Sequence, residues 1–208
     1  MIYQLMSDDY GEGVIMGDPE QKPKKTRSVT FRIDSSVVDE LQREADRKEV
    51  SLNVLANQVL KRYSEWDRFE ERLGMMPVPK IILSTLIEKA IEVAKKSGIK
   101  NIDPYRDEII KQAADVAFNI LKDSVLYMKK NYNLWTVLSM LQEYMKVSGI
   151  NADHVIQGRK HIFVIKHELG ENWSLFTQEL LKMIFERLAK VRIETNITPN
   201  TAKAEVIL

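Results

Sequence analysis

The stretch Ser28-Val29-Thr30-Phe31-Arg32-Ile33-Asp34 alternates polar and apolar side chains, and it decides how the N-terminal part of the chain folds. Alternation with a period of two residues is typical of a β-strand that buries one face. The apolar face carries Val29, Phe31 and Ile33. A lone strand is not stable in water, and no second strand is predicted near this one in the sequence. The pattern therefore predicts pairing with the same strand of a second subunit, which gives a two-stranded antiparallel ribbon.

Two amphipathic helices are predicted directly after this strand. Asp34 or Ser35 can cap the first helix, which runs to about Lys48. Ser51 can cap the second helix, which continues to about Leu73. The apolar stripes of both helices would cover the apolar face of the ribbon. The stripe residues are Val37, Val38, Leu41 and Ala45 in the first helix and Leu52, Leu55, Ala56, Val59, Leu60 and Tyr63 in the second.

This order of a strand and two helices resembles the ribbon-helix-helix family of DNA-binding transcription regulators, the Arc/MetJ type. The resemblance rests on residues 27–34, 38–41 and 50–53 and on the apolar stripe that follows as far as Leu60. In that family the ribbon of a homodimer enters the major groove of DNA, which is wide enough for two strands. The resemblance implies a sequence-specific regulator of transcription whose partners are double-stranded DNA and a second copy of the chain.

The resemblance also assigns DNA-contacting residues. The outward side chains of the strand would touch bases, because arginine can bond both major-groove acceptors of guanine and serine or threonine can reach several base edges. The predicted base-contacting residues are Ser28, Thr30 and Arg32. Basic side chains before the strand and free N–H groups at the start of the second helix would hold phosphates. The predicted phosphate-contacting residues are Lys24, Lys25, Arg27, Ser51, Leu52 and Asn53.

One position departs from the family, which usually has glycine in the turn between its two helices. Lys48 and Glu49 occupy that turn here, and a non-glycine residue rarely adopts a positive φ. We therefore expect a turn of a different shape. A strand and two helices of this kind can also serve dimerisation alone. The alternative function is an antitoxin-like or adaptor protein that dimerises through the same unit and binds a protein partner.

The charge of the chain is unevenly distributed. The formal net charge of +1 by itself indicates no nucleic-acid partner. Residues 1–20 carry five acidic and no basic side chains, whereas residues 22–34 carry five basic side chains and one acidic side chain. Such a basic stripe is a local electrostatic footprint for DNA. The absence of cysteine, of a signal-peptide pattern and of a long apolar run predicts a cytoplasmic protein without a membrane partner.

The sequence predicts an α+β protein of three parts. Residues 1–26, which contain several glycines and prolines, are expected to form a flexible arm, and residues 27–73 the ribbon-helix-helix dimerisation unit. Gly74 and Pro77-Val78-Pro79 separate this unit from residues 79–208, a helical effector or oligomerisation domain with a small antiparallel sheet. The segment 74–79 is also similar to archaeal proteins that join such a DNA-binding unit to a larger C-terminal domain.

Residues 79–208 show helical periods first and strand periods later. Trp173 and Phe176 belong to the apolar face of the last predicted helix. Helices are predicted over Lys80–Lys96, 103–130, Leu134–Val147 and 171–190, and strands over 154–157, 160–167, 192–197 and 202–208.

The three histidines of the chain are the strongest candidates for a site in this domain. His161 and His167 are expected on one side of one strand, and His154 on the neighbouring strand, so a metal site can be drawn. Because their spacing matches no known metal signature, we expect hydrogen-bonded structural histidines and neither metal nor cofactor. The junction at residues 167–174 could also receive an anion or a carboxylate. No catalytic motif is present, so we expect no enzyme.

Overall fold

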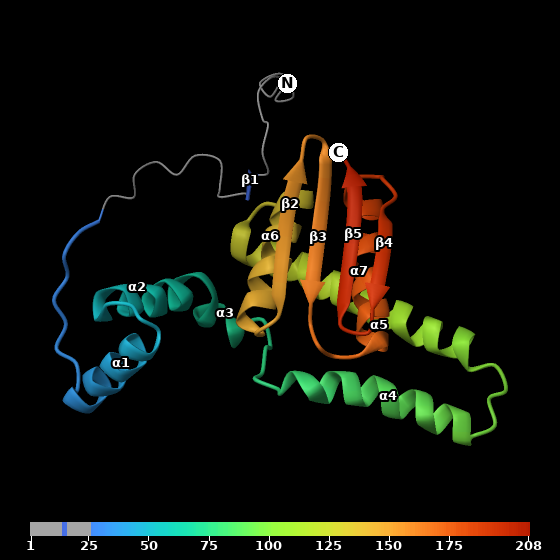
Figure 1. The fold of residues 1–208 in the computed structure, drawn as a ribbon, viewed down its shortest axis with the longest axis horizontal. Coiled ribbons are helices and arrows are strands. Elements are labelled where there is room, and N and C mark those ends of the chain that lie inside the picture. Colours follow the sequence, from blue (N-terminus) through green and yellow to red (C-terminus); the bar gives the residue numbers. More distant parts are fainter. Residues whose placement is uncertain (1–13, 16–25) are drawn as a thin grey trace. The chain divides into compact units, whose positions relative to one another are not determined.

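The computed structural model describes residues 14–15 and 26–208, and these residues form an α+β protein with a small antiparallel sheet (Figure 1). They divide into two compact units, one made of residues 26–77 and the other of residues 78–208 together with 14–15. None of the described helices has both the length and the apolar composition needed to cross a bilayer.

The larger unit combines long helices with a five-stranded sheet. Its helices are α4 (Lys80–Lys96), α5 (Ile102–Lys129), α6 (Leu134–Val147) and α7 (Glu171–Leu188). Its strands are β1 (Val14–Ile15), β2 (Asn151–Gln157), β3 (Lys160–Lys166), β4 (Glu194–Thr198) and β5 (Thr201–Ile207). The strand order is β1-β2-β3-β5-β4, and all neighbouring strands are antiparallel.

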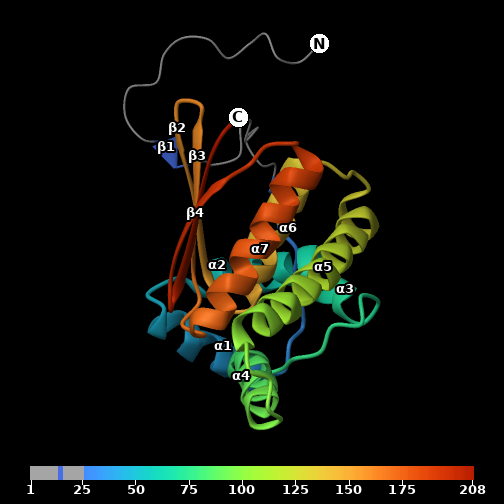
Figure 2. The ribbon, with the colours of Figure 1, turned by 90° about the vertical axis from the view of Figure 1, so that its right-hand side faces the viewer.

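Helices α5, α6 and α7 lie on one side of this sheet (Figure 2). Burial therefore alternates along β3 and β5, as expected for strands with one covered face. Phe163 of β3 pairs with Ala204 of β5, and the Phe163 ring lies 5.3 Å from the ring of Phe185 in α7. The small side chain of Ala204 lets bulkier neighbours fill the space between sheet and helices. The core of this unit lies in that layer.

Most element boundaries of the larger unit were predicted to within one residue. The bounds of α4 and α6 agree with the predicted ranges, and α6 begins at a capping box in which Asn133 and Thr136 exchange hydrogen bonds. Two strands were misplaced: β2 begins at Asn151, before the predicted residue 154, and β4 begins at Glu194, after the predicted residue 192. Helix α7 ends at Leu188, short of the predicted residue 190.

Strand β1 corrects one further prediction. The arm over residues 1–26 was expected to contain no regular structure, but Val14 pairs with Ile156 and Ile15 with Val155 of β2. Two residues are too few to show a period in the sequence, so the pairing depends on the edge that β2 offers. The rest of the arm, apart from residue 26, lies outside the described residues.

The smaller unit is built from helices around little buried apolar surface. It contains α1 (Ser35–Arg47) and α2 (Leu52–Arg62), and α2 continues through a π-helical turn, η1 (Tyr63–Asp67), into α3 (Arg68–Glu70). Trp66 of η1 is buried, and its indole N–H donates to the Glu70 carboxylate at 2.8 Å.

The turn between α1 and α2 contains a residue with positive φ, although the lack of glycine there had predicted a different turn. Glu49 has a φ of 55°, in the left-handed region. The N–H of Val50 donates to the carbonyl of Ala45, and the N–H of Glu49 to that of Asp46, which is a Schellman motif. The prediction of a different turn shape was therefore wrong. The two backbone hydrogen bonds that close the helix outweigh the steric cost at Glu49.

Glycine at this position should stabilise the smaller unit. Glu49→Gly removes the steric cost of the left-handed conformation, which is about 1–2 kcal/mol for a residue with a Cβ atom. Glycine also loses more backbone entropy on folding, which offsets part of this gain. We expect the free energy of unfolding to rise by roughly 0.5–1 kcal/mol. Urea titrations at a fixed protein concentration measure this change. Glu49→Ala is the control and should give no such gain. Destabilisation by Glu49→Gly would show that the left-handed turn is not present.

Candidate nucleic-acid interface

Residues 26–34 run as an extended segment (Figure 1) that forms neither helix nor strand and pairs with no other described strand. The strand predicted over residues 28–34 is therefore not formed in the single chain. All of its side chains are exposed. Val29, Phe31 and Ile33 are 60%, 60% and 53% exposed, respectively. An extended backbone without a pairing partner, carrying three large apolar side chains in water, is stabilised by nothing within the described chain.

The apolar exposure continues over the two helices of the smaller unit. The buried apolar side chains of residues 26–77 are Ala45, Leu55 and Trp66, which is a small core for a unit of this length. Exposed apolar surface on this scale is typical of an interaction surface. The exposed members of the smaller unit are Val29, Phe31, Ile33, Val37, Val54, Val59, Leu60, Tyr63 and Met76.

The predicted base-contacting residues lie on the polar positions of the extended segment. Ser28, Thr30 and Arg32 are all exposed and alternate with the apolar residues. Arg27 and Arg32 form no ion pair with any described residue. Lys24 and Lys25 lie outside the described residues.

Helix α1, in contrast, binds its own basic side chains. Glu44 holds Arg47 at 2.6 Å and Lys48 at 3.0 Å. Hydrogen bonds from Arg47 and Lys48 keep the pKa of Glu44 below its usual value. Arg43 is likewise paired with Glu40. The basic side chains Arg43, Arg47 and Lys48 are therefore neutralised locally, whereas Arg27 and Arg32 have no ion-pair partner among the described residues.

The N-terminus of α2 has backbone N–H groups that could bind an anion. Ser51 is the N-cap, as predicted, and its hydroxyl accepts a hydrogen bond from the Val54 N–H at 3.3 Å. The first turn contains no acidic residue. Among the described residues no partner bonds the N–H groups of Leu52 and Asn53, so these two can still donate. Sequence reasoning had not shown that the cap uses the Val54 N–H.

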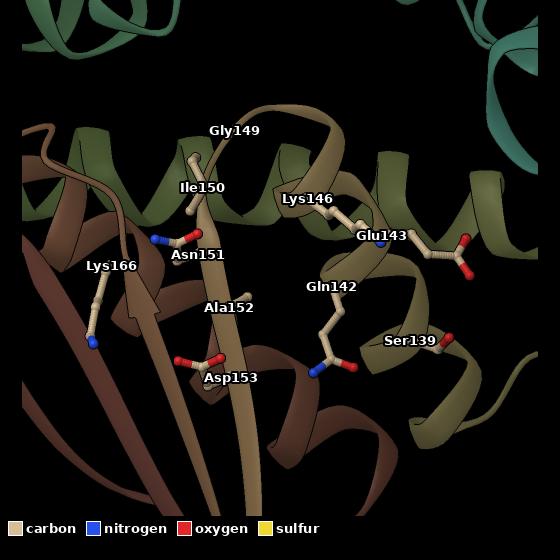
Figure 3. Close-up of a pocket in the computed structure, with 10 residues that line it drawn as sticks. All are labelled: Ser139, Gln142, Glu143, Lys146, Gly149, Ile150, Asn151, Ala152, Asp153 and Lys166. Atoms are coloured by element: carbon tan, nitrogen blue, oxygen red, sulfur yellow. The ribbon is translucent and has the colours of Figure 1, made fainter. Parts of the chain in front are cut away.

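A groove in the larger unit lies between α6 and the β2 strand (Figure 3). Its volume is about 640 Å³. Side chains of both charges and the amides of Gln142 and Asn151 line it, and the Glu143 carboxylate is bonded to Lys129 Nζ at 2.9 Å. Such a lining suits a small polar molecule better than an apolar one. The lining residues are Ser139, Gln142, Glu143, Lys146, Gly149, Ile150, Asn151, Ala152, Asp153 and Lys166.

The structure separates the three histidines into two groups. His154 and His161 face each other across the β2–β3 pair, with 3.0 Å between His154 Nε2 and His161 Nδ1. His167 follows the end of β3, and its Nε2 lies 2.8 Å from Ser174 Oγ in α7. No group of three or more potential metal ligands comes together among the described residues.

His167 is held in one neutral form by its neighbours. Its Nδ1 accepts from the Leu169 N–H at 3.0 Å, so Nε2 carries the proton and donates to Ser174 Oγ. The Ser174 hydroxyl in turn donates to the Thr198 carbonyl at 2.6 Å. Burial, and secondarily the charge of Lys80, lower the pKa of His167 to about 4. These hydrogen bonds join the start of α7 to β4. His167 therefore has a structural role.

The predicted anion site at this junction already has a carboxylate beside it. Gly170, with a φ of 86°, precedes α7, and a Cβ atom built on Gly170 would lie 3.4 Å from Glu88 Oε1 of α4. The positive end of α7 is thus near an acidic side chain of its own unit.

Comparison with known proteins gives no assignment: no family model matches the chain, and no curated protein matches it.

The histidines should make stability depend on pH between about 4 and 6.5. Burial lowers the pKa of both His154 and His167 to about 4, whereas unfolded histidine titrates near 6.5. The unfolded chain therefore binds more protons in this window, so the free energy of unfolding should fall as the pH falls from about 6.5 to about 4. Urea titrations at several pH values measure this slope.

The matched variant is His167→Gln, which cannot titrate. It should lower stability at pH 7, because the bonds to Leu169 and Ser174 are disturbed, and it should flatten the pH dependence between about 4 and 6.5. An unchanged slope in His167→Gln would mean that folding does not lower the pKa of His167.

Proposed function

We propose that the chain is a sequence-specific DNA-binding regulator of transcription, which acts in the cytoplasm as a homodimer of the ribbon-helix-helix type. The observation that carries the proposal is the segment 28–34. It pairs with no other described strand, and it exposes three apolar side chains that alternate in the sequence with Ser28, Thr30 and Arg32.

Dimerisation would give this segment both backbone hydrogen bonds and cover for its apolar side chains. Two copies aligned antiparallel exchange backbone hydrogen bonds, because every residue from 28 to 34 has an N–H group to donate. The apolar face of the ribbon would then pack on the apolar stripes of α1 and α2, where Val37, Val59 and Leu60 are about half exposed in the single chain.

DNA binding follows from the opposite face of the ribbon. Ser28, Thr30 and Arg32 would enter the major groove together, and Arg32 would fork onto a guanine. The donors at Leu52 and Asn53 and the arm residues Lys24 and Lys25 would hold phosphates, which fixes the ribbon in the groove without reading sequence. The larger unit, with its polar groove, would be the effector or oligomerisation domain.

Arg32→Ala should lower affinity for the operator much more than for scrambled DNA. A bidentate contact from arginine to guanine discriminates by about 1–3 kcal/mol. Lys24→Ala combined with Lys25→Ala is the control: it should weaken both DNAs alike and reduce the salt dependence by about one unit of slope for each lost phosphate contact. The operator comes from selection on random DNA, and salt titrations then compare both DNAs.

Equal losses of operator and scrambled DNA in Arg32→Ala would mean that the segment does not read bases. If selection enriches no DNA while the chain remains a dimer, the adaptor function is the correct one.

Phe31→Ala should convert dimer into monomer. Phe31 would be buried in the ribbon core, and truncation of a buried phenylalanine costs about 3–5 kcal/mol. Much of this cost should appear as a raised dimer dissociation constant in sedimentation equilibrium. Val116→Ala is the control, because Val116 is similarly exposed on α5 of the larger unit. A wild-type chain that is folded and monomeric at micromolar concentration would refute the dimer.

A further inference from the structure

Helix α4 buries one side against its own unit. Ser84, Ile91 and Ala94 are buried, and Lys80 Nζ donates to the Gly149 carbonyl at 3.5 Å. Glu88 lies beside Gly170 at the start of α7. These contacts fix which side of α4 faces the core of the larger unit.

The opposite side of α4 is also apolar. Nine residues make two and a half turns of an α-helix, so Ile82 lies opposite the buried Ile91, and Val93 lies opposite the buried Ser84. Ile82, Leu86 and Val93 are 44%, 62% and 61% exposed. A surface helix should be polar on the side away from its core, and a helix that is apolar on both sides is typically covered on both.

The stripe formed by Ile82, Leu86, Ala90 and Val93 offers apolar contact and little else. The charged groups beside it are bonded to each other within the helix, since Lys89 and Lys96 both hold Glu92, at 2.6 and 2.7 Å. Ala90, in the middle of the stripe, is small enough to let a second helix approach closely. The stripe therefore fits an apolar helix better than a nucleic acid or a charged peptide.

A second copy of α4 is the apolar helix that the chain itself supplies. The smaller unit ends at Pro77 and α4 begins at Lys80, so about 10 Å of chain at most joins them. In the proposed dimer each α4 therefore starts within that length of chain from its own smaller unit, and the two α4 helices are tethered to each other through the ribbon. Such tethering raises the effective concentration of the two helices for each other into the millimolar range. A twofold interface also uses the same patch on both subunits.

We infer that this stripe is a second self-association surface, on which α4 of one subunit packs against α4 of its partner within the dimer. The inference rests on the proposed function for the first contact between the two chains. It extends the dimer interface from the ribbon to the larger units, so that their relative position is fixed as well.

Cysteine cross-linking in the full chain tests the inference cleanly, because the sequence contains no cysteine. Ile82, Leu86, Ala90 and Val93 are each changed to Cys, and disulfide formation is followed on non-reducing gels at low micromolar concentration. A disulfide needs the two Cα atoms within about 7 Å, which a twofold helix contact provides near its axis. Lys95→Cys is the matched control, because Lys95 is exposed and lies nine residues from Leu86, on the opposite side of the helix.

We expect at least one stripe position to cross-link ten times faster than Lys95→Cys, with slower reaction on either side of it. We also expect Leu86→Lys combined with Val93→Lys to raise the dimer dissociation constant at least tenfold while circular dichroism stays unchanged. A wild-type dimer in which no stripe position exceeds the Lys95→Cys rate overturns the α4 contact and leaves the ribbon dimer intact. A wild-type monomer in sedimentation overturns the dimer itself, and the α4 contact with it.

Discussion

The backbone and the apolar side chains of residues 28–34 both need partners, and the described chain supplies neither. Val29, Phe31 and Ile33 are more than half exposed, and no described strand lies beside them. Apolar burial contributes about 25 cal/mol for each Å² removed from water, so leaving this face uncovered forfeits several kcal/mol. For a small unit, that is a large part of the total stability.

The two units of the chain differ in how much of their apolar surface they bury. The larger unit closes its own core, in which Ile110, Val125, Ile184 and Phe185 are at most 2% exposed. The smaller unit buries Ala45, Leu55 and Trp66 and leaves Val37, Val59, Leu60 and Tyr63 of its apolar stripe exposed. Its helices are nonetheless well formed at their ends, by the Asp34 and Ser51 caps and by the Glu49 turn. Defined helices around few buried apolar side chains are consistent with the proposed dimer, in which a second copy would cover the exposed apolar surface.

Sequence patterns predicted what local chemistry decides and missed what depends on distant contacts. The cap at Ser51 was predicted, and the first cap was narrowed to Asp34 or Ser35, because such side-chain oxygens act within a few residues; the structure uses Asp34. Glu49 was mispredicted because statistics on φ ignore the two hydrogen bonds that hold its turn. Strand β1 was missed because its partner, β2, lies well over a hundred residues away.

The candidate site shows the same division. The alternation that placed Ser28, Thr30 and Arg32 on one face is a local property, and the structure keeps all three exposed. The grouping of His161 and His167 followed from strand spacing alone, whereas β3 ends at Lys166 and His167 turns to Ser174. The apolar outer side of α4 needed the structure, because only the buried contacts of Ile91 and Ser84 reveal which side remains uncovered.

Amide hydrogen exchange over residues 28–34 tests the central claim most directly. In a paired ribbon the amides that bond across the strands exchange slowly, and the protection disappears as the protein is diluted below its dimer dissociation constant. Slow, concentration-dependent exchange within this segment, beside fast exchange at Thr26, is the predicted result. Fast exchange of the whole segment at concentrations where the chain is a dimer would contradict the account.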